Sequence, residues 1–320
     1  MQLRYFLIGL VSCVGLLLSC RGVNPVGPVQ ENWCDHPARP GLEKLKERPT
    51  KRSWFKVYEV GNGVLAISEP YQSQEVNSFL ILGKDKALLF DSGMGMDTIS
   101  ALVKELTSLP VLVLNSHTHP DHIGGNHEFD SVLALSTSFT NRNALEGYGH
   151  AGMRTEIGSD AFCFKHLPGF DTAQYSIKPF RIAGRVGEGD RIDLGGRILE
   201  ILATPGHTPD AVALLDSAQG YLWTGDSFYL GPIWLFMDGT DLNAYDHGIH
   251  RMSALAPSLR SVFPAHNLPV VEPIYLDSVT RAFNDVMMGK VAGAARDGGT
   301  KLYSFGSFGF LLRDDAVPQP

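Results

Sequence analysis

Short apolar runs alternate along this chain with stretches of helical period. Val111–Leu114 follows Pro110 and stops at a polar cluster, which predicts a buried strand that ends in a loop. Residues 97–109 carry apolar side chains at helical spacing and predict a helix that covers a sheet. Further strands are predicted at 54–60, 64–67, 78–82, 87–90, 198–202, 211–215 and 221–223, helices at 242–255 and 274–295, and one or two short strands within 301–313. This order predicts an α/β fold of two sheet-and-helix halves packed face to face.

The stretch between residues 143 and 175 follows neither period and contains several glycines. We interpret it as a lid or loop insertion near a substrate pocket, or as a plain surface excursion. His150 and His166 lie in it, and we interpret each as an ordinary surface or core histidine.

An apolar stretch at residues 5–18 follows a short basic start and precedes Cys20. Its length suits a signal-peptide core and is short for a membrane span. The residues before Cys20 resemble a bacterial lipobox, in which this cysteine is lipidated; an ordinary secretory peptide cut elsewhere is the alternative. We therefore predict a lipoprotein-type signal peptide at 1–20, a tether and amino-terminal extension at 21–53 and one large domain at 54–320. The mature protein would be exported to the periplasmic face or cell envelope.

Composition and net charge limit the kinds of molecule that this chain is expected to bind. The 320 residues are 44% hydrophobic and carry a formal net charge of -7, which gives a large core and no basic field to attract nucleic acid. We therefore expect a small-molecule substrate, and membrane contact only through the lipid anchor. Oligomeric state does not follow from the sequence. Cys34 and Cys163 remain after the signal peptide, and whether they pair does not follow either.

The loop after Val111–Leu114 carries the chemistry. It places three imidazoles and a carboxylate within six residues, at His117, His119, Asp121 and His122. These side chains are ready ligands for a first-row metal ion, whereas a merely polar loop seldom combines them. The loop is thus a predicted metal site.

This His-x-His-x-Asp-His stretch resembles the signature of the metallo-β-lactamase-fold hydrolases. Later residues extend the resemblance, because a Gly-His, an Asp and a last His each follow an apolar run in the order of that family, at His207, Asp226 and His266. The resemblance implies a four-layer αβ/βα sandwich for the domain at 54–320, with the ligands along one edge.

The same resemblance implies a two-metal site. His117, His119 and His207 would hold one ion, Asp121, His122 and His266 the other, and Asp226 would bridge them. The implied cofactor is two Zn²⁺, with iron or manganese also compatible with these ligand types. A hydroxide between the ions would attack a carbonyl carbon, and Asp121 would accept or relay the proton. Asp91 would support the metal loop, or would simply cap the following turn.

A bridging Asp226 resembles glyoxalase II thioesterases, lactonases and related esterases more than true zinc β-lactamases. Tyr229, three residues later, resembles a tyrosine of the acyl-homoserine lactonases that assists the carbonyl or leaving oxygen; otherwise it is a pocket-wall or core residue. We predict an exported di-zinc, lactonase-like hydrolase of esters, lactones or thioesters. The alternatives are β-lactamase activity at the same site, or a non-hydrolytic metal or redox protein on the same fold.

Overall fold

The structure is a computed structural model, and it describes residue 34 and residues 38–317. The chain divides into two compact units, residues 1–31 and 32–320, and all of the described residues belong to the second. The predicted signal peptide and Cys20 lie outside the described residues and stay predictions. Within the described part, none of the helices has the length and apolar character needed to cross a membrane.

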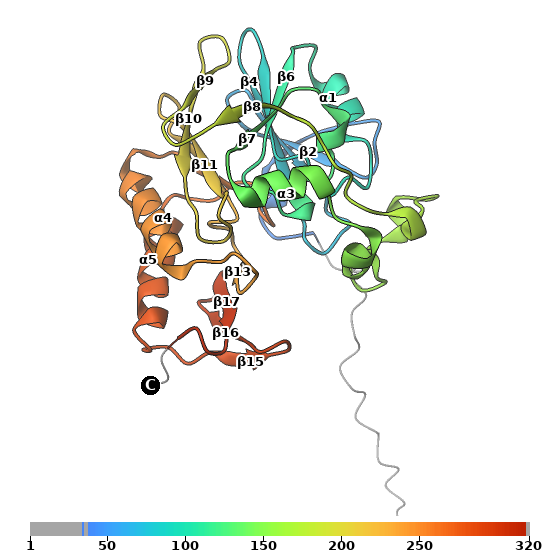
Figure 1. The fold of residues 1–320 in the computed structure, drawn as a ribbon. Coiled ribbons are helices and arrows are strands. Elements are labelled where there is room, and N and C mark those ends of the chain that lie inside the picture. Colours follow the sequence, from blue (N-terminus) through green and yellow to red (C-terminus); the bar gives the residue numbers. More distant parts are fainter. Residues whose placement is uncertain (1–33, 35–37, 318–320) are drawn as a thin grey trace, which may run out of the picture. The chain divides into compact units, whose positions relative to one another are not determined.

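The largest sheet has eight strands that follow one another in sequence order (Figure 1). They are β1 (Lys46–Arg48), β2 (Lys56–Gly61), β3 (Val64–Ser68), β4 (Asn77–Leu82), β5 (Ala87–Phe90), β6 (Val111–Leu114), β7 (Val132–Leu135) and β8 (Ile182–Val186). Pairing is antiparallel from β1 to β5 and parallel from β5 to β8. Because β5 and β6 run parallel, Asp91 and the predicted metal loop both follow the carboxyl ends of their strands and lie at the same end of the sheet.

The second sheet has five strands, in the order β14 (Ser261–Pro264), β12 (Tyr221–Gly225), β11 (Val212–Asp216), β10 (Ile198–Ala203) and β9 (Arg191–Asp193). The pair β12 and β14 is parallel. Asp226 and His266 follow these two strands closely, so they also leave their sheet at a common edge.

The two sheets pack face to face because their strands alternate between two buried faces. On β4 and β5, Phe79 and Phe90 join Trp223 and Phe263 of the second sheet in one core. Leu80 and Leu89 point the other way, into a core with α1 (Ile99–Leu106). Helices α4 (Leu242–Leu255) and α5 (Ile274–Met287) cover the outer face of the second sheet. The predicted four-layer αβ/βα order is confirmed.

Two short helices flank the metal loop. They are α2 (Pro120–Ile123), within the loop itself, and α3 (Ser138–Glu146). The Thr137 hydroxyl caps α3 by accepting from the Thr140 backbone N–H. Asp241 caps α4 in the same way, with two backbone N–H donors, and this helix has the predicted bounds.

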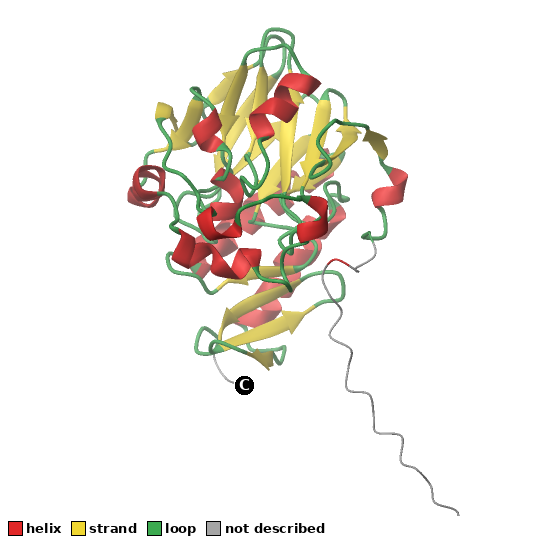
Figure 2. Cartoon of the chain, turned by 90° about the vertical axis from the view of Figure 1, so that its right-hand side faces the viewer, coloured by secondary structure: helices red, strands yellow, loops and turns green. Residues whose placement is uncertain are grey.

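A third, four-stranded sheet was only partly predicted. Its order is β13 (Pro232–Leu235), β17 (Gly309–Arg313), β16 (Thr300–Ser304) and β15 (Ala294–Arg296), and Figure 2 shows it below the larger sheets. The predicted helix 274–295 is wrong beyond Met287, because Gly289 takes a φ of 69°, which breaks the helix. The predicted strands within 301–313 are confirmed as β16 and β17.

The insertion at 143–175 is anchored to the main body. Met153, Phe162 and Tyr175 are buried in the core outside the eight-stranded sheet. A disulfide joins Cys163 to Cys34, 129 residues earlier, and so ties the insertion to the amino-terminal extension. Tyr148 donates to the carbonyl of Thr118 in the metal loop at 3.0 Å. The insertion therefore supports the loop and is more than a surface excursion.

Candidate metal centre

The structure brings all seven predicted ligands to one place. Strand ends of both large sheets deliver them, and their ligand atoms form three overlapping groups in which the atoms of each group lie within 4.8 Å of one another. The groups are His117, His119 and His207; His117, His122 and Asp226; and Asp121, His122 and His266.

Two glycines allow the loops to come this close. Gly225, just before Asp226, has a φ of 52°, and a Cβ there would lie 2.5 Å from the Cβ of Ser116. Gly206, just before His207, has a φ of 148°, and its Cβ would lie 2.4 Å from the Cα of Tyr245 on α4. A side chain at position 225 would push the two halves of the site apart, and one at position 206 would push the loop of His207 away from α4.

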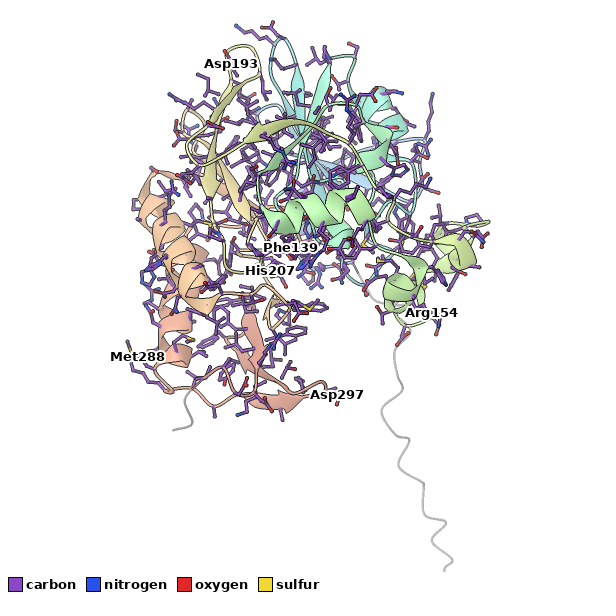
Figure 3. The ribbon with its side chains drawn as sticks, viewed as in Figure 1. Phe139, Arg154, Asp193, His207, Met288 and Asp297 are labelled. Carbon is purple, nitrogen blue, oxygen red and sulfur yellow. A yellow bond between two sulfur atoms is a disulfide. The ribbon has the colours of Figure 1, made fainter. Side chains whose placement is uncertain are left out.

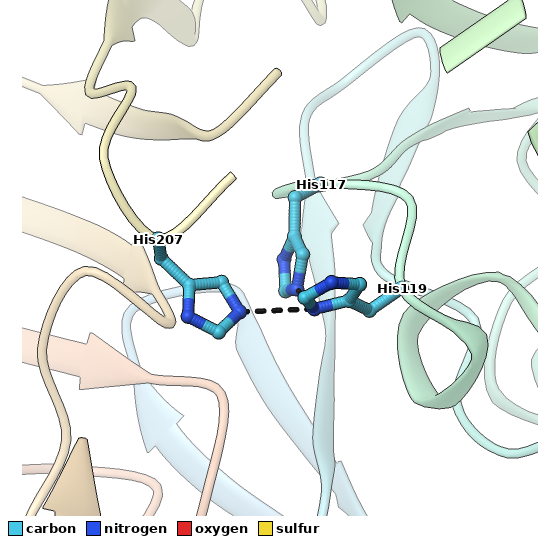
Figure 4. Close-up of side chains that lie close together, drawn as sticks. All are labelled: His117, His119 and His207. Atoms are coloured by element: carbon cyan, nitrogen blue, oxygen red, sulfur yellow. Dashed lines mark hydrogen bonds between the residues drawn. The ribbon is translucent and has the colours of Figure 1, made fainter. Parts of the chain in front are cut away.

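Three imidazoles converge in the first group, as Figure 4 shows. His117 Nε2 and His207 Nε2 each lie 3.0 Å from His119 Nδ1. His117 and His119 lie two residues apart in the loop after β6, and His207 lies in the loop after β10. Three ring nitrogens aimed at a common point are the arrangement of a three-histidine metal site.

Asp226 lies between this first group and the group of Asp121, His122 and His266, which we call the second group below. Its Oδ2 is 3.5 Å from His207 Nε2, and its Oδ1 is 3.0 Å from His266 Nε2 and 3.4 Å from His122 Nε2. Asp121 completes the second group, with Oδ2 3.3 Å from His122 Nε2. The carboxylate of Asp226 thus faces imidazoles on both sides.

Each ring that presents Nε2 to the centre has a partner for Nδ1. The partners are Ser116 Oγ for His117 at 3.1 Å, Asp91 Oδ2 for His122 at 3.1 Å, the Trp234 carbonyl for His207 at 2.7 Å and the Gln74 carbonyl for His266 at 2.7 Å. Such outer contacts fix ring orientation and leave Nε2 free to bind a cation. Asp91 also accepts from the Ser116 N–H at 2.7 Å, so its contacts are those of a residue that supports the metal loop.

The pKa values of the histidines shift in opposite directions in the first and second groups. Burial lowers the pKa of His117 and His207, and burial together with His207 lowers the pKa of His119 to about 3. Burial also opposes charge on His122 and His266, but the carboxylates of Asp121 and Asp226 outweigh it and raise both pKa values.

The two carboxylates respond in the opposite sense. Burial opposes their ionisation, but His122 and His266 lower the pKa of Asp121 to about 2 and hold that of Asp226 well below its usual range. The first group therefore offers neutral imidazole lone pairs, and the second group offers anionic oxygen.

Two buried atoms test whether a cation fits. Among the described residues, His122 Nε2 and Asp226 Oδ1 make no well-aligned hydrogen bond, although both are shielded from solvent and lie 3.4 Å from each other. Buried polar atoms are normally paired, and leaving one unpaired costs free energy. A cation between them would satisfy both, and a set of imidazoles and carboxylates without thiolate suits zinc. The residues therefore fit a metal ion.

The remaining predicted site residue, Tyr229, lies beside the centre. Its ring centroid is 4.9 Å from that of His266, and its hydroxyl donates to the Pro232 carbonyl at 2.6 Å. Burial raises its pKa, so the hydroxyl keeps its proton. Its role in catalysis stays a prediction. His150 and His166 have contacts elsewhere, with the Tyr175 carbonyl and the Tyr71 ring, as expected of ordinary histidines.

Asp210 supports the centre and was missed from the sequence. Its Oδ2 accepts from Thr118 at 2.6 Å and Thr140 at 2.9 Å, and its Oδ1 accepts from Thr208 at 2.7 Å. This buried carboxylate therefore joins the loop of His117 and His119, the loop of His207 and helix α3. Its place three residues after His207 was the one signal in the sequence.

Glu69 is a second buried carboxyl group that was missed. Its Oε1 accepts from the Met94 N–H at 2.8 Å and its Oε2 from the Trp54 indole at 2.6 Å. Burial raises its pKa to about 7, against these two donors, which lower it. Glu69 thereby holds the turn after Asp91, which contacts the metal loop.

Comparisons with known proteins identify the family of this chain. The family model described as "Metallo-beta-lactamase superfamily" matches residues 74–266, more than half of the chain and a range that includes all seven candidate ligands. The acyl-coenzyme A thioesterase MBLAC2 of Gallus gallus is 25% identical over 236 residues, 69% of this chain and 84% of that protein. A hydroxyacylglutathione hydrolase of Synechococcus is 28% identical over 139 residues, 42% of each chain.

Solved structures show the same fold. A beta-lactamase domain protein of Burkholderia ambifaria superposes with a TM-score of 0.52 at 21% identity, over 79% of this chain and 80% of that one. An archaeal metallo-beta-lactamase superfamily protein of Sulfolobus tokodaii gives 0.50 at 20% identity, over 74% and 91%.

Replacing Asp210 with Asn should weaken the centre without unfolding the protein. An amide has only one acceptor oxygen, so at least one of the three hydroxyl donors loses its partner. We expect zinc affinity, measured by competition with a chromophoric chelator, to fall by roughly tenfold to a hundredfold. Thr208→Ser keeps the hydroxyl and is the matched control. An unchanged affinity in Asp210→Asn would show that the network does not position the ligands.

Glu69 should make stability depend on pH. Its folded pKa of about 7 lies above the reference value of 4.5, so its contribution is full below pH 4.5 and declines as pH rises through 7. The shift corresponds to about 3 kcal/mol. We expect the stability difference between wild type and Glu69→Gln, from urea unfolding at pH 5 to 8, to shrink as pH rises. A constant difference would contradict the raised pKa.

Proposed function

The chain belongs to the metallo-beta-lactamase superfamily, and from that premise we propose that it is a zinc-dependent hydrolase of esters, lactones or thioesters. In this proposal His117, His119 and His207 hold one ion, Asp121, His122 and His266 hold a second, and Asp226 contacts both.

One observation carries the proposal. The Asp226 carboxylate faces His207 on one side and His266 on the other, at 3.5 and 3.0 Å, and among the described residues its buried Oδ1 makes no well-aligned hydrogen bond in spite of these contacts. Asp226 would fit between two bound cations, because imidazoles of both groups surround its carboxylate. The same residue argues against true β-lactamase activity, which stays the second candidate function of the site.

The chain's own residues account for the rest of the chemistry. Bound zinc supplies a coordinated water with a pKa of about 7 and draws charge from a carbonyl oxygen. Asp121, with 13% of its side chain exposed, reaches solvent and is placed to accept a proton at Oδ2 and pass it on. In thioester hydrolysis the acyl carbon gains the oxygen of water, the carbon–sulfur bond breaks, and the thiol leaves with a proton.

Two relatives that act on thioesters support a thioester substrate. The two curated relatives described above are named for hydrolysis of acyl-coenzyme A and of hydroxyacylglutathione, both of which are thioesters. We therefore place thioesters first, followed by lactones and other esters.

We further propose that the mature protein is exported and lipid-anchored at Cys20. The basic start, the apolar stretch and the lipobox-like residues support this, and so does the disulfide between Cys34 and Cys163, since such bonds persist in oxidising compartments.

Metal removal tests the enzymatic proposal. We expect about two zinc ions per chain by elemental analysis, thioester hydrolysis on a panel that also holds a lactone, a phosphodiester and a cephalosporin, and loss of turnover by roughly a hundredfold or more after chelation. Asp121→Ala should abolish turnover with the fold retained. Asp246 is a carboxylate on α4 outside the candidate site, and Asp246→Ala should keep turnover. In the same assay Tyr229→Phe should cause a modest rate loss.

Two results would refute the proposed activity. Redox-active iron without hydrolysis favours the non-hydrolytic alternative, and cephalosporin turnover alone favours the β-lactamase. An unchanged rate for Tyr229→Phe would return this residue to the pocket wall.

Export is tested separately by expressing the full chain in a bacterium. We expect the protein in the membrane fraction, and release into the soluble periplasmic fraction when Cys20 is replaced by Ala. Full recovery of the wild-type protein in the cytoplasmic fraction would contradict export.

A further inference from the structure

The small sheet carries a groove on the face that is turned away from its core. The groove measures about 380 Å³, within the usual size of small-molecule sites. Most of its lining is apolar, and the side chains that matter are Trp234 and Phe236 around β13, Leu311 on β17 and Leu302 on β16.

Strand alternation explains why this face is apolar. On β13, Ile233 and Leu235 point into the core against α4 and α5, so Trp234 points outward. Tyr303 and Leu312 fill the same core from β16 and β17. Trp234, which lines the groove, and Met237, three residues later, are each 37% exposed, so large apolar side chains lie on this surface.

Strand β13 contacts both the groove and a candidate metal ligand. The backbone carbonyl of Trp234 accepts from His207 Nδ1 at 2.7 Å, on the side of the ring away from the cluster, and the side chain of Trp234 lines the groove. The loop between β13 and α4 also contacts the segment of His207, because the Thr240 hydroxyl donates to the His207 carbonyl at 3.3 Å. On the other side of the centre, the ring of Phe139 on α3 packs 5.8 Å from the ring of His119. Apolar side chains therefore border the cluster on both sides.

The groove has a polar far end. Arg296 and Asp297 line it at β15, the strand at the opposite edge of the sheet from β13. Three strand spacings separate these edges, about 14 Å at the usual spacing. Figure 3 shows Asp297 well away from His207. The apolar length is thus limited, which fits a chain of medium length better than a bulky ring system.

We propose that this groove binds the apolar acyl chain of the substrate, and that the enzyme prefers medium-chain acyl thioesters over acetyl thioesters. The inference rests on the proposed function, because the acyl carbonyl would sit at the metal centre while the chain runs along the small sheet. Trp234 forms the start of the path, and Leu302 and Leu311 form its floor.

Chain length tests this inference. The probes are acetyl, butanoyl, hexanoyl and decanoyl thioesters of N-acetylcysteamine, assayed with the metal-loaded full chain. Each buried methylene adds at most about fourfold to kcat/KM, so we expect the decanoyl-to-acetyl ratio to exceed roughly tenfold in the wild type. Leu302→Gln should lower that ratio by about threefold to tenfold. Ile274→Gln, an exposed apolar residue on α5 outside the groove, is the matched control and should keep the ratio.

A binding measurement separates this inference from the proposed function. We expect 1-decanol, which carries no group to be hydrolysed, to change tryptophan fluorescence in the wild type and in Ile274→Gln, and to bind more weakly to Leu302→Gln. Thermal melting confirms that each variant is folded. Decanol binding without thioester hydrolysis would support the groove and refute the enzyme. Thioester hydrolysis with a flat chain-length profile, or equal decanol binding by Leu302→Gln, would overturn the groove.

Discussion

The buried carboxylate of Asp226, set between imidazoles from both halves of the fold, is the interaction on which the rest of the structure depends. A charge removed from water must be matched, and its two oxygens face His207 at 3.5 Å and His266 at 3.0 Å. The rings in turn are held by Nδ1 contacts to backbone carbonyls and to Asp91. The orientation of these rings, more than their number, makes the cluster a credible site for metal ions.

That orientation is maintained by a second layer of buried polar groups. Asp210 binds three hydroxyls from three separate segments, and Glu69 binds an indole and a backbone N–H beside the turn that follows Asp91. Each group replaces water with fixed donors, so the loops at the strand ends cannot drift without breaking hydrogen bonds in a low-dielectric interior. The insertion adds to this layer through Tyr148, which holds the Thr118 carbonyl.

The small sheet connects this centre to a region outside the family match. The match ends at residue 266, whereas β15, β16 and β17 lie beyond it. Strand β13 lies within it and pairs in parallel with β17, so its backbone holds His207 while its outward side chains continue the surface of the later strands. The same strand thus links the candidate metal centre to the proposed recognition of the acyl chain.

Local pattern determined much of this protein. The sequence by itself placed Val111–Leu114, α4 and the other predicted strands close to their observed bounds, because apolar periodicity is readable within a few residues, although it missed β1, β7, β8, β9, β13 and β15. The first four candidate ligands were readable in one loop, and the resemblance to a known family added His207, Asp226 and His266. It extended the helix at 274 too far, since apolar spacing continues past the turn at Gly289. Only the tertiary structure decided the pairing of β13 with β17, the partnership of Cys34 with Cys163, and the meeting of Thr118, Thr140 and Thr208 on Asp210. These contacts join distant segments, and the free energy that selects them comes from packing and burial that no local pattern records.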